Sequence, residues 1–171
     1  LADFLTIKEE FGRLEDLVLT FVGDGNNVAN SLILCGALVG VKIRIACPKG
    51  YEPNQQIISK AKEISGDNDL LTITNDPSKA ALDANILYTD VWTSMGEENK
   101  KQKKDQEFNG YTLDESLLSM AKEDAIILHC LPAYRGKEIS NQVMEGAKSR
   151  IFDQAENRLH VQQALLSCFL S

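Results

Sequence analysis

The chain has 171 residues, 43% of them hydrophobic and 25% charged, and its formal net charge is −7. This composition is typical of a globular domain, and the length suffices for one substantial core or one domain with appended helices. The acidic balance argues against nucleic-acid binding as the main function, and no apolar run approaches the roughly 20 residues of a membrane span.

The apolar periodicity predicts alternating helices and strands. In chain order these are a helix near residues 2–11, a strand at 17–22, a helix at about 26–39, a strand at 42–46, a helix at about 54–64, a strand at 70–74, a short helix near 77–82, a strand at 85–89, a helix near 113–120, a strand at 125–128, a short helix near 139–146, a strand near 150–152 and a helix at about 155–170. The alternation predicts an α/β fold of three layers, in which helices cover both faces of a mainly parallel, doubly wound (Rossmann-like) sheet.

One segment interrupts this alternation. The stretch Glu97–Gln106 is expected to be a mobile loop that is too polar to pack a core. Its basic residues lie among acidic ones, so we interpret them as a solvated cluster and not as a nucleic-acid surface. They are Lys100, Lys101, Lys103 and Lys104.

The spacing of the cysteines indicates whether they could bind a metal. Cys35, Cys47, Cys130 and Cys168 form no CxxC pair and no zinc-like spacing with the two histidines, so we expect no metal and a reducing cytoplasm or organelle matrix. Cys35 and Cys168 fall in apolar helical patterns and are expected to be small core residues. Cys47 ends a strand, and only Cys130 has a context that indicates chemistry.

Polar side chains follow two of the predicted strands. The strand at 125–128 runs into His129-Cys130-Leu131-Pro132-Ala133, and the strand at 85–89 runs into Asp90-Val91-Trp92-Thr93-Ser94-Met95-Gly96. Open α/β sheets bind their ligands at the carboxyl ends of the strands. An acid, a hydroxyl and a thiol at two such ends indicate the rim of an active site.

A glycine-containing turn follows the first strand, with the sequence Gly23-Asp24-Gly25-Asn26-Asn27-Val28. A dinucleotide site is one alternative, although the third glycine of that fingerprint falls on Val28 and the next strand ends in Cys47-Pro48 without an acid. A plain strand-to-helix turn is another. We favour a turn in which the Asn27 amide and backbone N–H groups at the helix N-terminus hold a ligand carboxylate.

Four motifs together resemble the ornithine carbamoyltransferase family. They are Gly23-Asp24-Gly25-Asn26-Asn27, Asp90-Val91-Trp92-Thr93-Ser94-Met95-Gly96, His129-Cys130-Leu131-Pro132 and Phe152-Asp153-Gln154-Ala155-Glu156-Asn157-Arg158. Their order and spacing agree with the family over essentially the whole chain. The related aspartate carbamoyltransferases carry HPLP in place of HCLP and lack the SMG loop.

The resemblance covers half of that enzyme. The S-x-R-T loop and the H-P-x-Q element of the family's N-terminal carbamoyl-phosphate domain do not occur in this sequence, and the sequence opens at Leu1 without an initiator Met. We therefore expect residues 1–171 to be the ornithine-binding domain of a longer protein. Its core would span about 14–153, and helices at 1–12 and 155–171 would connect to the absent domain. The resemblance further implies a homotrimer in the cytoplasm, or in the mitochondrial matrix of a eukaryote, with no nucleic-acid or membrane partner.

The family's reaction needs no cofactor. The δ-amine of L-ornithine attacks the carbonyl carbon of carbamoyl phosphate and yields L-citrulline and phosphate, a reaction that serves arginine biosynthesis, the urea cycle or the arginine deiminase pathway. The isolated chain is expected to be inactive. The alternatives are a related carbamoyltransferase for acetylornithine or putrescine, a non-catalytic amino-acid-binding module, and the dinucleotide-binding domain considered above.

The resemblance assigns the two central residues of the reaction. Cys130 would contact the δ-amine and carbamoyl phosphate, and Asp90 would bind the substrate's amino groups and complete a chain toward Cys130. A thiolate at Cys130 would require a cationic neighbour or oriented donors. From the residues alone, Cys130 is also compatible with a small buried side chain, and Asp90 with an acid that caps the following turn.

The resemblance also assigns the residues around the substrates. Asn27 would hold the α-carboxylate of ornithine. Ser94 would offer its hydroxyl and Met95 a backbone N–H from a loop that closes over ornithine. Leu131 would point its backbone carbonyl at the carbamoyl group.

Three further side chains have two interpretations each. Arg158 would reach carbamoyl phosphate, or it pairs on the surface with Glu156. His129 is compatible with a packed side chain or one that orients a carbonyl, and equally with a residue that performs acid–base chemistry. Trp92 is expected to pack the loop and not to stack on a ligand.

Overall fold

The computed structural model describes residues 1–93, 99 and 101–170. It contains a five-stranded, all-parallel sheet with the strand order β3-β2-β1-β4-β5. The strands are β1 (Val18–Val22), β2 (Lys42–Ala46), β3 (Leu71–Thr74), β4 (Ile86–Thr89) and β5 (Ile126–His129). The sequence-based expectation of a doubly wound, Rossmann-like α/β fold is confirmed.

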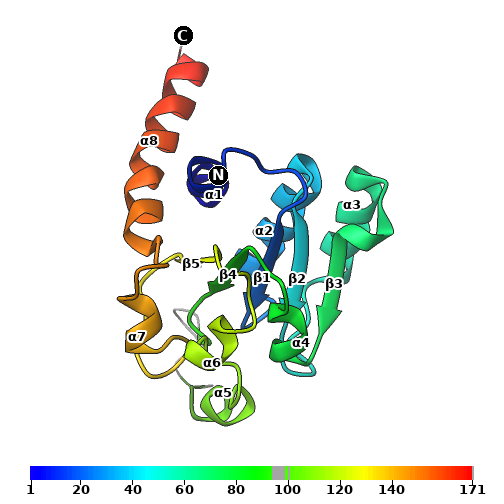
Figure 1. Cartoon of the computed structure of the whole chain (residues 1–171). Coiled ribbons are helices and arrows are strands. Elements are labelled where there is room, and N and C mark those ends of the chain that lie inside the picture. Colours follow the sequence, from blue (N-terminus) through cyan, green and yellow to red (C-terminus); the bar gives the residue numbers. More distant parts are fainter. Residues whose placement is uncertain (94–98, 100, 171) are drawn as a thin grey trace.

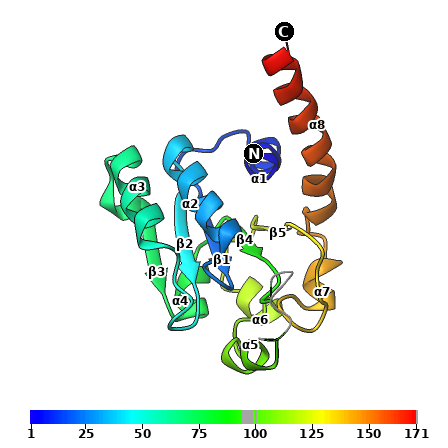
Figure 2. The same ribbon diagram turned by 180° about the vertical axis from the view of Figure 1, so that it is seen from behind.

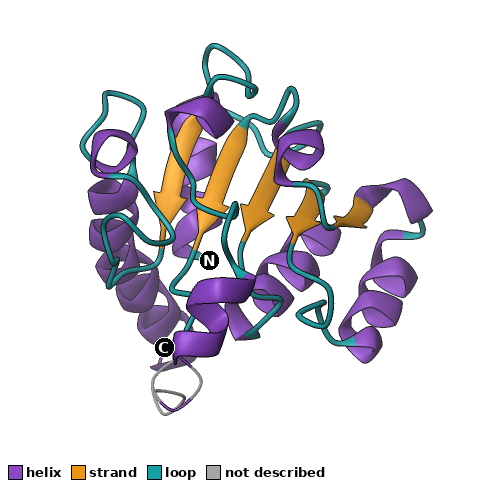
Figure 3. Cartoon of the chain, turned by 90° about the horizontal axis from the view of Figure 1, so that it is seen from below, coloured by secondary structure: helices purple, strands orange, loops and turns teal. Residues whose placement is uncertain are grey.

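Helices cover both faces of this sheet (Figure 3). They are α1 (Ala2–Phe11), α2 (Asn27–Val39), α3 (Gln55–Ser65), α4 (Pro77–Ala81), α5 (Lys101–Glu107), α6 (Glu115–Leu118), α7 (Asn141–Met144) and α8 (Ile151–Leu170), and a short 3₁₀ turn spans Asn68–Leu70. Among these described helices, none combines the length and apolar character that crossing a bilayer requires.

Alternation along the strands divides the core in two. On β1, Leu19 and Phe21 join an apolar cluster with α1, α2 and α3, whereas Val22 joins a second cluster with α4, α6 and α7. Successive strand side chains point to opposite faces, so a strand buried on both faces is apolar almost throughout. This explains the apolar strand sequences and the three layers.

The helices begin where capping side chains allow it. Asn26, Asn54, Asp76, Asp114 and Ser140 each accept a hydrogen bond from a backbone N–H in the first turn of the helix that follows. These caps fix where α2, α3, α4, α6 and α7 begin.

The two terminal helices lie together at one end of the molecule. Figures 1 and 2 both show α1 beside α8, with α8 extending beyond the rest of the chain. The Asn157 side chain of α8 donates hydrogen bonds to Thr6 Oγ1 at 2.9 Å and to Glu9 Oε2 at 2.6 Å. Helices from opposite ends of the sequence therefore form one unit beside β5.

Three expectations from the sequence are wrong. Part of the expected polar loop at 97–106 is helix α5, and its Lys104 is 3% exposed because it pairs with Asp24. The expected strand near 150–152 is the start of α8, and only a single bridge between Ile127 and Ser149 continues the sheet there. Two adjacent apolar residues are too few to distinguish a strand from a helix. Cys168, expected in the core, is exposed near the end of α8.

Candidate functional site

A cavity of about 480 Å³ lies between the terminal helices and the carboxyl ends of β4 and β5. The strand order reverses between β1 and β4, and doubly wound sheets bind ligands at such a switch point. The residues around this cavity include four of the predicted site residues: Asn27, Cys130, Leu131 and Arg158. The fold therefore brings together residues that are up to 131 positions apart in the sequence.

The register of β4 and β5 joins Asp90 to Cys130. Thr89 pairs with His129 in the sheet, so the next residue of each strand end falls at the same level. The Cys130 thiol donates a hydrogen bond to Asp90 Oδ1, with 3.0 Å between Sγ and the oxygen. The predicted contact between these two side chains is present.

The neighbour of Cys130 is an anion. Burial raises the pKa of the Cys130 thiol well above its ordinary value, and the charge of Asp90 and its hydrogen bond raise it further. The group at this position is therefore a protonated thiol that donates to a carboxylate, and not the thiolate beside a cation that a covalent nucleophile would need.

Asp90 also receives hydrogen bonds from two directions. Its Oδ1 accepts from the backbone N–H of Val91 at 2.7 Å, so the acid does cap the turn that follows β4. Its Oδ2 accepts from Asn26 Nδ2 at 3.5 Å, while Asn26 Oδ1 caps α2 through the Val28 N–H. The capping role and the contact with Cys130 coexist at Asp90.

Asn26 was missed by the sequence analysis, which singled out its neighbour Asn27. Asn27 is the first residue of α2 and lies exposed at the cavity, next to the backbone N–H groups of the helix N-terminus. The signal for Asn26 was its position directly before a helix, where asparagine is a preferred cap. Its second contact, to Asp90, depends on the tertiary fold.

The loop after β5 is held by a buried histidine. His129 is fully buried, and its Nδ1 accepts a hydrogen bond from the Leu131 N–H at 2.8 Å. Its Nε2 lies 3.4 Å from Oε1 of buried Glu138. Leu131 adopts a left-handed φ of 56°, and its bond to Pro132 is cis. His129 thus shapes the loop through the Leu131 N–H, and no contact of His129 with a carbonyl is seen among the described residues.

The turn after β1 is fixed by a close backbone approach and an ion pair. A Cβ on Gly25 would lie 2.4 Å from the Pro53 nitrogen and 2.5 Å from the Tyr51 oxygen, so only glycine fits. The Asp24 carboxylate lies 2.6 Å from the Lys104 ammonium, and both side chains are almost fully buried. This ion pair attaches α5 to the turn that carries Asn26.

The remaining predicted residues have separate outcomes. Arg158 lies exposed at the cavity, while Glu156 lies 3.7 Å from His160. Trp92 is buried and stacks on Phe108 at 5.6 Å between ring centroids, which confirms loop packing. Ser94 and Met95 lie outside the described residues.

No group at the site is assigned as a metal ligand. Donor atoms of Asp90, His129 and Cys130 lie within 4.8 Å of one another. The Cys130 thiol already donates to Asp90 and His129 Nδ1 already accepts from the Leu131 N–H, whereas His129 Nε2 has no hydrogen-bond partner among the described residues. An ion would have to displace the Cys130 proton and the bond from the Leu131 N–H.

Comparison with known proteins identifies the family. Residues 15–169 match the model of the aspartate/ornithine carbamoyltransferase family, in the part described as the Asp/Orn binding domain. The chain belongs to this carbamoyltransferase family. The resemblance inferred from the four motifs is confirmed.

This chain aligns with about half the length of its relatives in the carbamoyltransferase family. The ornithine carbamoyltransferase of Prochlorococcus marinus subsp. pastoris is 70% identical over 170 residues, which cover 99% of this chain and 55% of that protein. That of a Nostoc species is 53% identical, with coverage of 99% and 56%. The chain spans about half the length of the curated relatives it matches.

Solved carbamoyltransferase structures share the fold. The ornithine carbamoyltransferase of Pyrococcus furiosus superposes with a TM-score of 0.92 at 40% identity, covering 97% of this chain and 53% of that one. The enzyme of Thermus thermophilus gives 0.87 at 44% identity, covering 99% and 54%. These matches favour the carbamoyltransferase family over the dinucleotide-binding alternative.

Proposed function

We propose that this chain is the ornithine-binding half of an ornithine carbamoyltransferase. The complete protein would transfer the carbamoyl group from carbamoyl phosphate to the δ-amine of L-ornithine and release citrulline and phosphate. The hydrogen bond between Cys130 and Asp90, beside a cavity that Asn27 and Arg158 also line, carries the proposal. The named ornithine carbamoyltransferases among the relatives support ornithine as the amine.

The chemistry of the amine explains an anionic site. An alkyl ammonium has a pKa near ~10.4, so presenting a free amine at pH 7 costs about 4–5 kcal/mol. The Asp90 carboxylate attracts the ammonium form and is an acceptor for its N–H groups. Burial beside the strand ends favours the neutral amine. As the amine nitrogen bonds to the carbonyl carbon, the bond from that carbon to the phosphate oxygen breaks. The nitrogen loses one proton, which is carried away by the phosphate that leaves as hydrogen phosphate.

The other site residues are proposed to act around this centre. Asn27 and the N-terminus of α2 would hold the α-carboxylate of ornithine, as favoured from the sequence. Leu131 would direct its carbonyl at the carbamoyl group, and Arg158 would neutralise carbamoyl phosphate. The roles of Ser94 and Met95 rest on the family resemblance alone.

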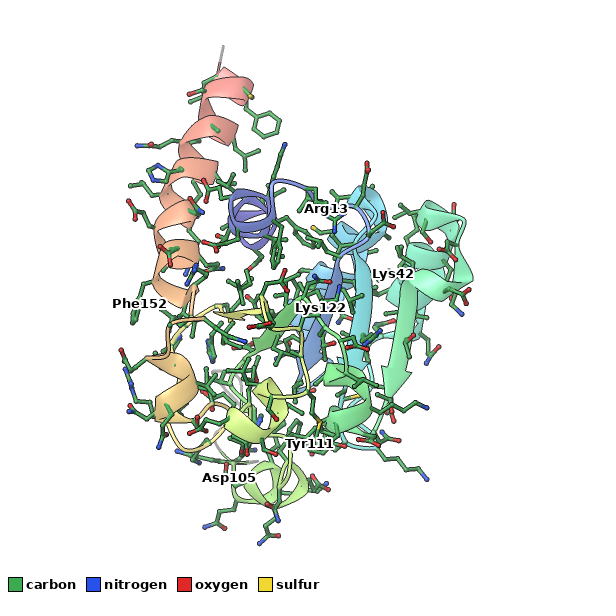
Figure 4. All side chains as sticks on the ribbon, in the orientation of Figure 1. Arg13, Lys42, Asp105, Tyr111, Lys122 and Phe152 are labelled. Carbon is green, nitrogen blue, oxygen red and sulfur yellow. The ribbon has the colours of Figure 1, made fainter. Side chains whose placement is uncertain are left out.

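We propose that α1 and α8 connect to a carbamoyl-phosphate domain. The core would span about 14–153, with connecting helices at 1–12 and 155–171. Figure 4 shows Phe152 pointing away from α8, and this side chain is 57% exposed. Further apolar side chains on α8 are exposed, and an apolar surface of this kind is typical of an interface. They are Leu159, Leu165, Leu166, Phe169 and Leu170.

The assembly and setting follow from the resemblance. A homotrimer in the cytoplasm, with a role in arginine biosynthesis or in arginine breakdown, is the proposal for the complete protein. Gel filtration of the complete protein with light scattering would measure the trimer directly.

A citrulline assay on the complete protein tests the proposed function. At saturating carbamoyl phosphate, we expect turnover with ornithine and none with acetylornithine, putrescine or aspartate. Cys130→Ala and Asp90→Ala should each lower kcat about a hundredfold or more, because each removes a group that contacts the reacting amine. The 171-residue chain alone should show no turnover.

Two substitutions serve as matched controls. Cys168→Ala near the end of α8 and Asp124→Ala just before β5 change the same residue types at exposed positions and should leave kcat within about twofold. Turnover with another amine would retain carbamoyl transfer and change the substrate. Absence of turnover with all four amines would reject the proposal and leave an amino-acid-binding module.

A further inference from the structure

Asp3, in the first turn of α1, joins three distant elements at the wall of the cavity. Its Oδ1 accepts a hydrogen bond from the Tyr88 hydroxyl of β4 at 2.9 Å and another from Gln154 Nε2 of α8 at 2.7 Å. All three side chains line the same cavity as Cys130. The family motifs did not indicate Asp3 or Tyr88 as site residues.

Tyr88 connects Asp3 to the reacting end of the sheet. It lies two residues before Asp90, so the two side chains fall on the same face of the strand and its extension. Its side chain is 1% exposed, and its ring stacks on Phe21 with 5.9 Å between centroids. A rigid ring with its hydroxyl hydrogen-bonded to Asp3 therefore forms the cavity wall next to Asp90 and Cys130.

Gln154 has only one side-chain partner for its amide among the described residues. It is 3% exposed, and its Oε1 is buried without a hydrogen bond there. Leaving a buried acceptor unsatisfied costs about 1–3 kcal/mol. The amide keeps this orientation because a carboxylate accepts hydrogen bonds and cannot donate them, so Asp3 selects the Nε2 side.

The charges around Cys130 come from several elements. Burial is the main reason that its thiol has a raised pKa, Asp90 is the next, and Asp3 adds to it, while the Tyr88 hydroxyl acts in the opposite direction. The charged and titratable side chains that face this region are Asp3 from α1, Cys35 from α2, Tyr88 from β4, Asp90 after β4, His129 from β5 and Arg158 from α8.

We propose that Asp3 is a positioning residue of this site, which fixes the Tyr88 hydroxyl at the cavity wall and places a second carboxylate near the Cys130 thiol. Asp3 thereby links the two terminal helices to the Cys130 thiol, which is proposed to contact the substrate amine. The expected effect of Asp3 on turnover rests on the proposed function, whereas its expected effect on the reactivity of Cys130 rests on geometry alone.

Two substitutions separate this role from a purely structural one. Asp3→Asn keeps an oxygen that can accept from Tyr88 but removes the charge, and Tyr88→Phe keeps the packed ring but removes the hydroxyl. Asp124→Asn, an equal change of charge at an exposed position just before β5, is the control. All are made in the complete protein, with melting temperatures measured alongside.

The first readout is the rate at which iodoacetamide alkylates Cys130, followed peptide by peptide by mass spectrometry. Asp3→Asn should speed this reaction roughly two- to fourfold, because less negative charge makes the thiolate easier to form while slightly lowering its nucleophilicity. Tyr88→Phe should slow it, because the Tyr88 hydroxyl lowers the pKa of the Cys130 thiol and its removal makes the thiolate harder to form. Asp124→Asn should leave the rate unchanged.

The second readout is citrulline formation. Asp3→Asn and Tyr88→Phe should each lower kcat roughly tenfold or more, with a smaller change in the KM for ornithine, because a displaced wall misaligns the reacting groups. Asp124→Asn should keep the wild-type kcat.

The outcomes are distinguishable. Equal acceleration of alkylation in both variants would show loosening of the fold and overturn the proposal, as would an unchanged kcat in both. If Asp3→Asn fails to fold, the alkylation rate and the kcat of Tyr88→Phe test the proposal instead. If the unmodified complete protein makes no citrulline, the proposed function fails, and the alkylation rates still decide whether Asp3 acts on Cys130.

Discussion

At the residue scale, the His129 imidazole shows how single hydrogen bonds shape the site. Because Nδ1 accepts from the Leu131 N–H, the neutral ring carries its proton on Nε2, which faces Glu138. Positive φ is uncommon for a residue with a side chain, and Leu131 sits at 56°. The buried histidine supplies the acceptor that holds this conformation at the cavity.

Substitution of His129 tests this role. His129→Leu removes the acceptor for the Leu131 N–H and the donor that faces Glu138, so the free energy of unfolding should fall by about 2–4 kcal/mol. His129→Asn retains an acceptor near the position of Nδ1 and should lose less than half as much. Urea unfolding of both variants measures the difference, and an equal loss would contradict the assigned hydrogen bond.

At the element scale, α5 is a helix that depends on tertiary contacts. Seven residues are too few for a stable isolated helix, and all seven are polar or charged. It is held by Lys104 on Asp24 at 2.6 Å and by Asp105, which pairs with Lys137 at 2.6 Å. The next residue after the helix, Phe108, is buried among aromatic rings.

Two lysines of α5 provide a matched comparison. Lys104→Ala removes the ammonium that faces the buried Asp24 carboxylate, and it should lower the free energy of unfolding by about 3 kcal/mol or more. Lys103→Ala removes a side chain that is 73% exposed and 3.7 Å from Glu107, and it should cost less than about 0.5 kcal/mol. Thermal and urea unfolding compare the variants, and similar losses would refute the structural role of the buried pair.

At the scale of the whole molecule, several acidic groups are buried in their neutral form. Burial and the nearby charges of Glu52 and Asp24 raise the pKa of Cys47 from an ordinary 9.0 to about 12. Burial also raises the pKa of Tyr88 well above its ordinary value, and Asp3 adds to this. Between the two pKa values of such a group, the unfolded chain holds fewer protons than the folded one.

Alkaline pH should therefore destabilise the fold. The free energy of unfolding keeps its full value below about pH 9 and falls as the pH rises toward 12. The fall is about 1.4 kcal/mol per pH unit for each group whose pKa is raised across that range. Cys47→Ala should reduce this slope, whereas Cys168→Ala, at an exposed position, should not change it. Urea unfolding across this pH range measures the slopes, and an unchanged slope in Cys47→Ala would contradict the raised pKa.

Much of the fold was predictable from local patterns. The apolar runs that became β1 to β5, and the capping residues before α2 and α3, act through their nearest neighbours in the chain. The order of helices and strands then predicted a parallel sheet and placed Asp90 and Cys130 at its carboxyl edge. The four motifs by themselves indicated the family.

The sequence by itself thus determined the α/β class, the family and the edge of the sheet at which Asp90 and Cys130 lie. Only the tertiary structure decided that Cys130 faces a carboxylate and that Lys104 is buried. It also decided that Asp3 contacts Tyr88, 85 positions away in the chain. These contacts join side chains from separate elements, and their energies depend on burial and orientation, which no local periodicity encodes.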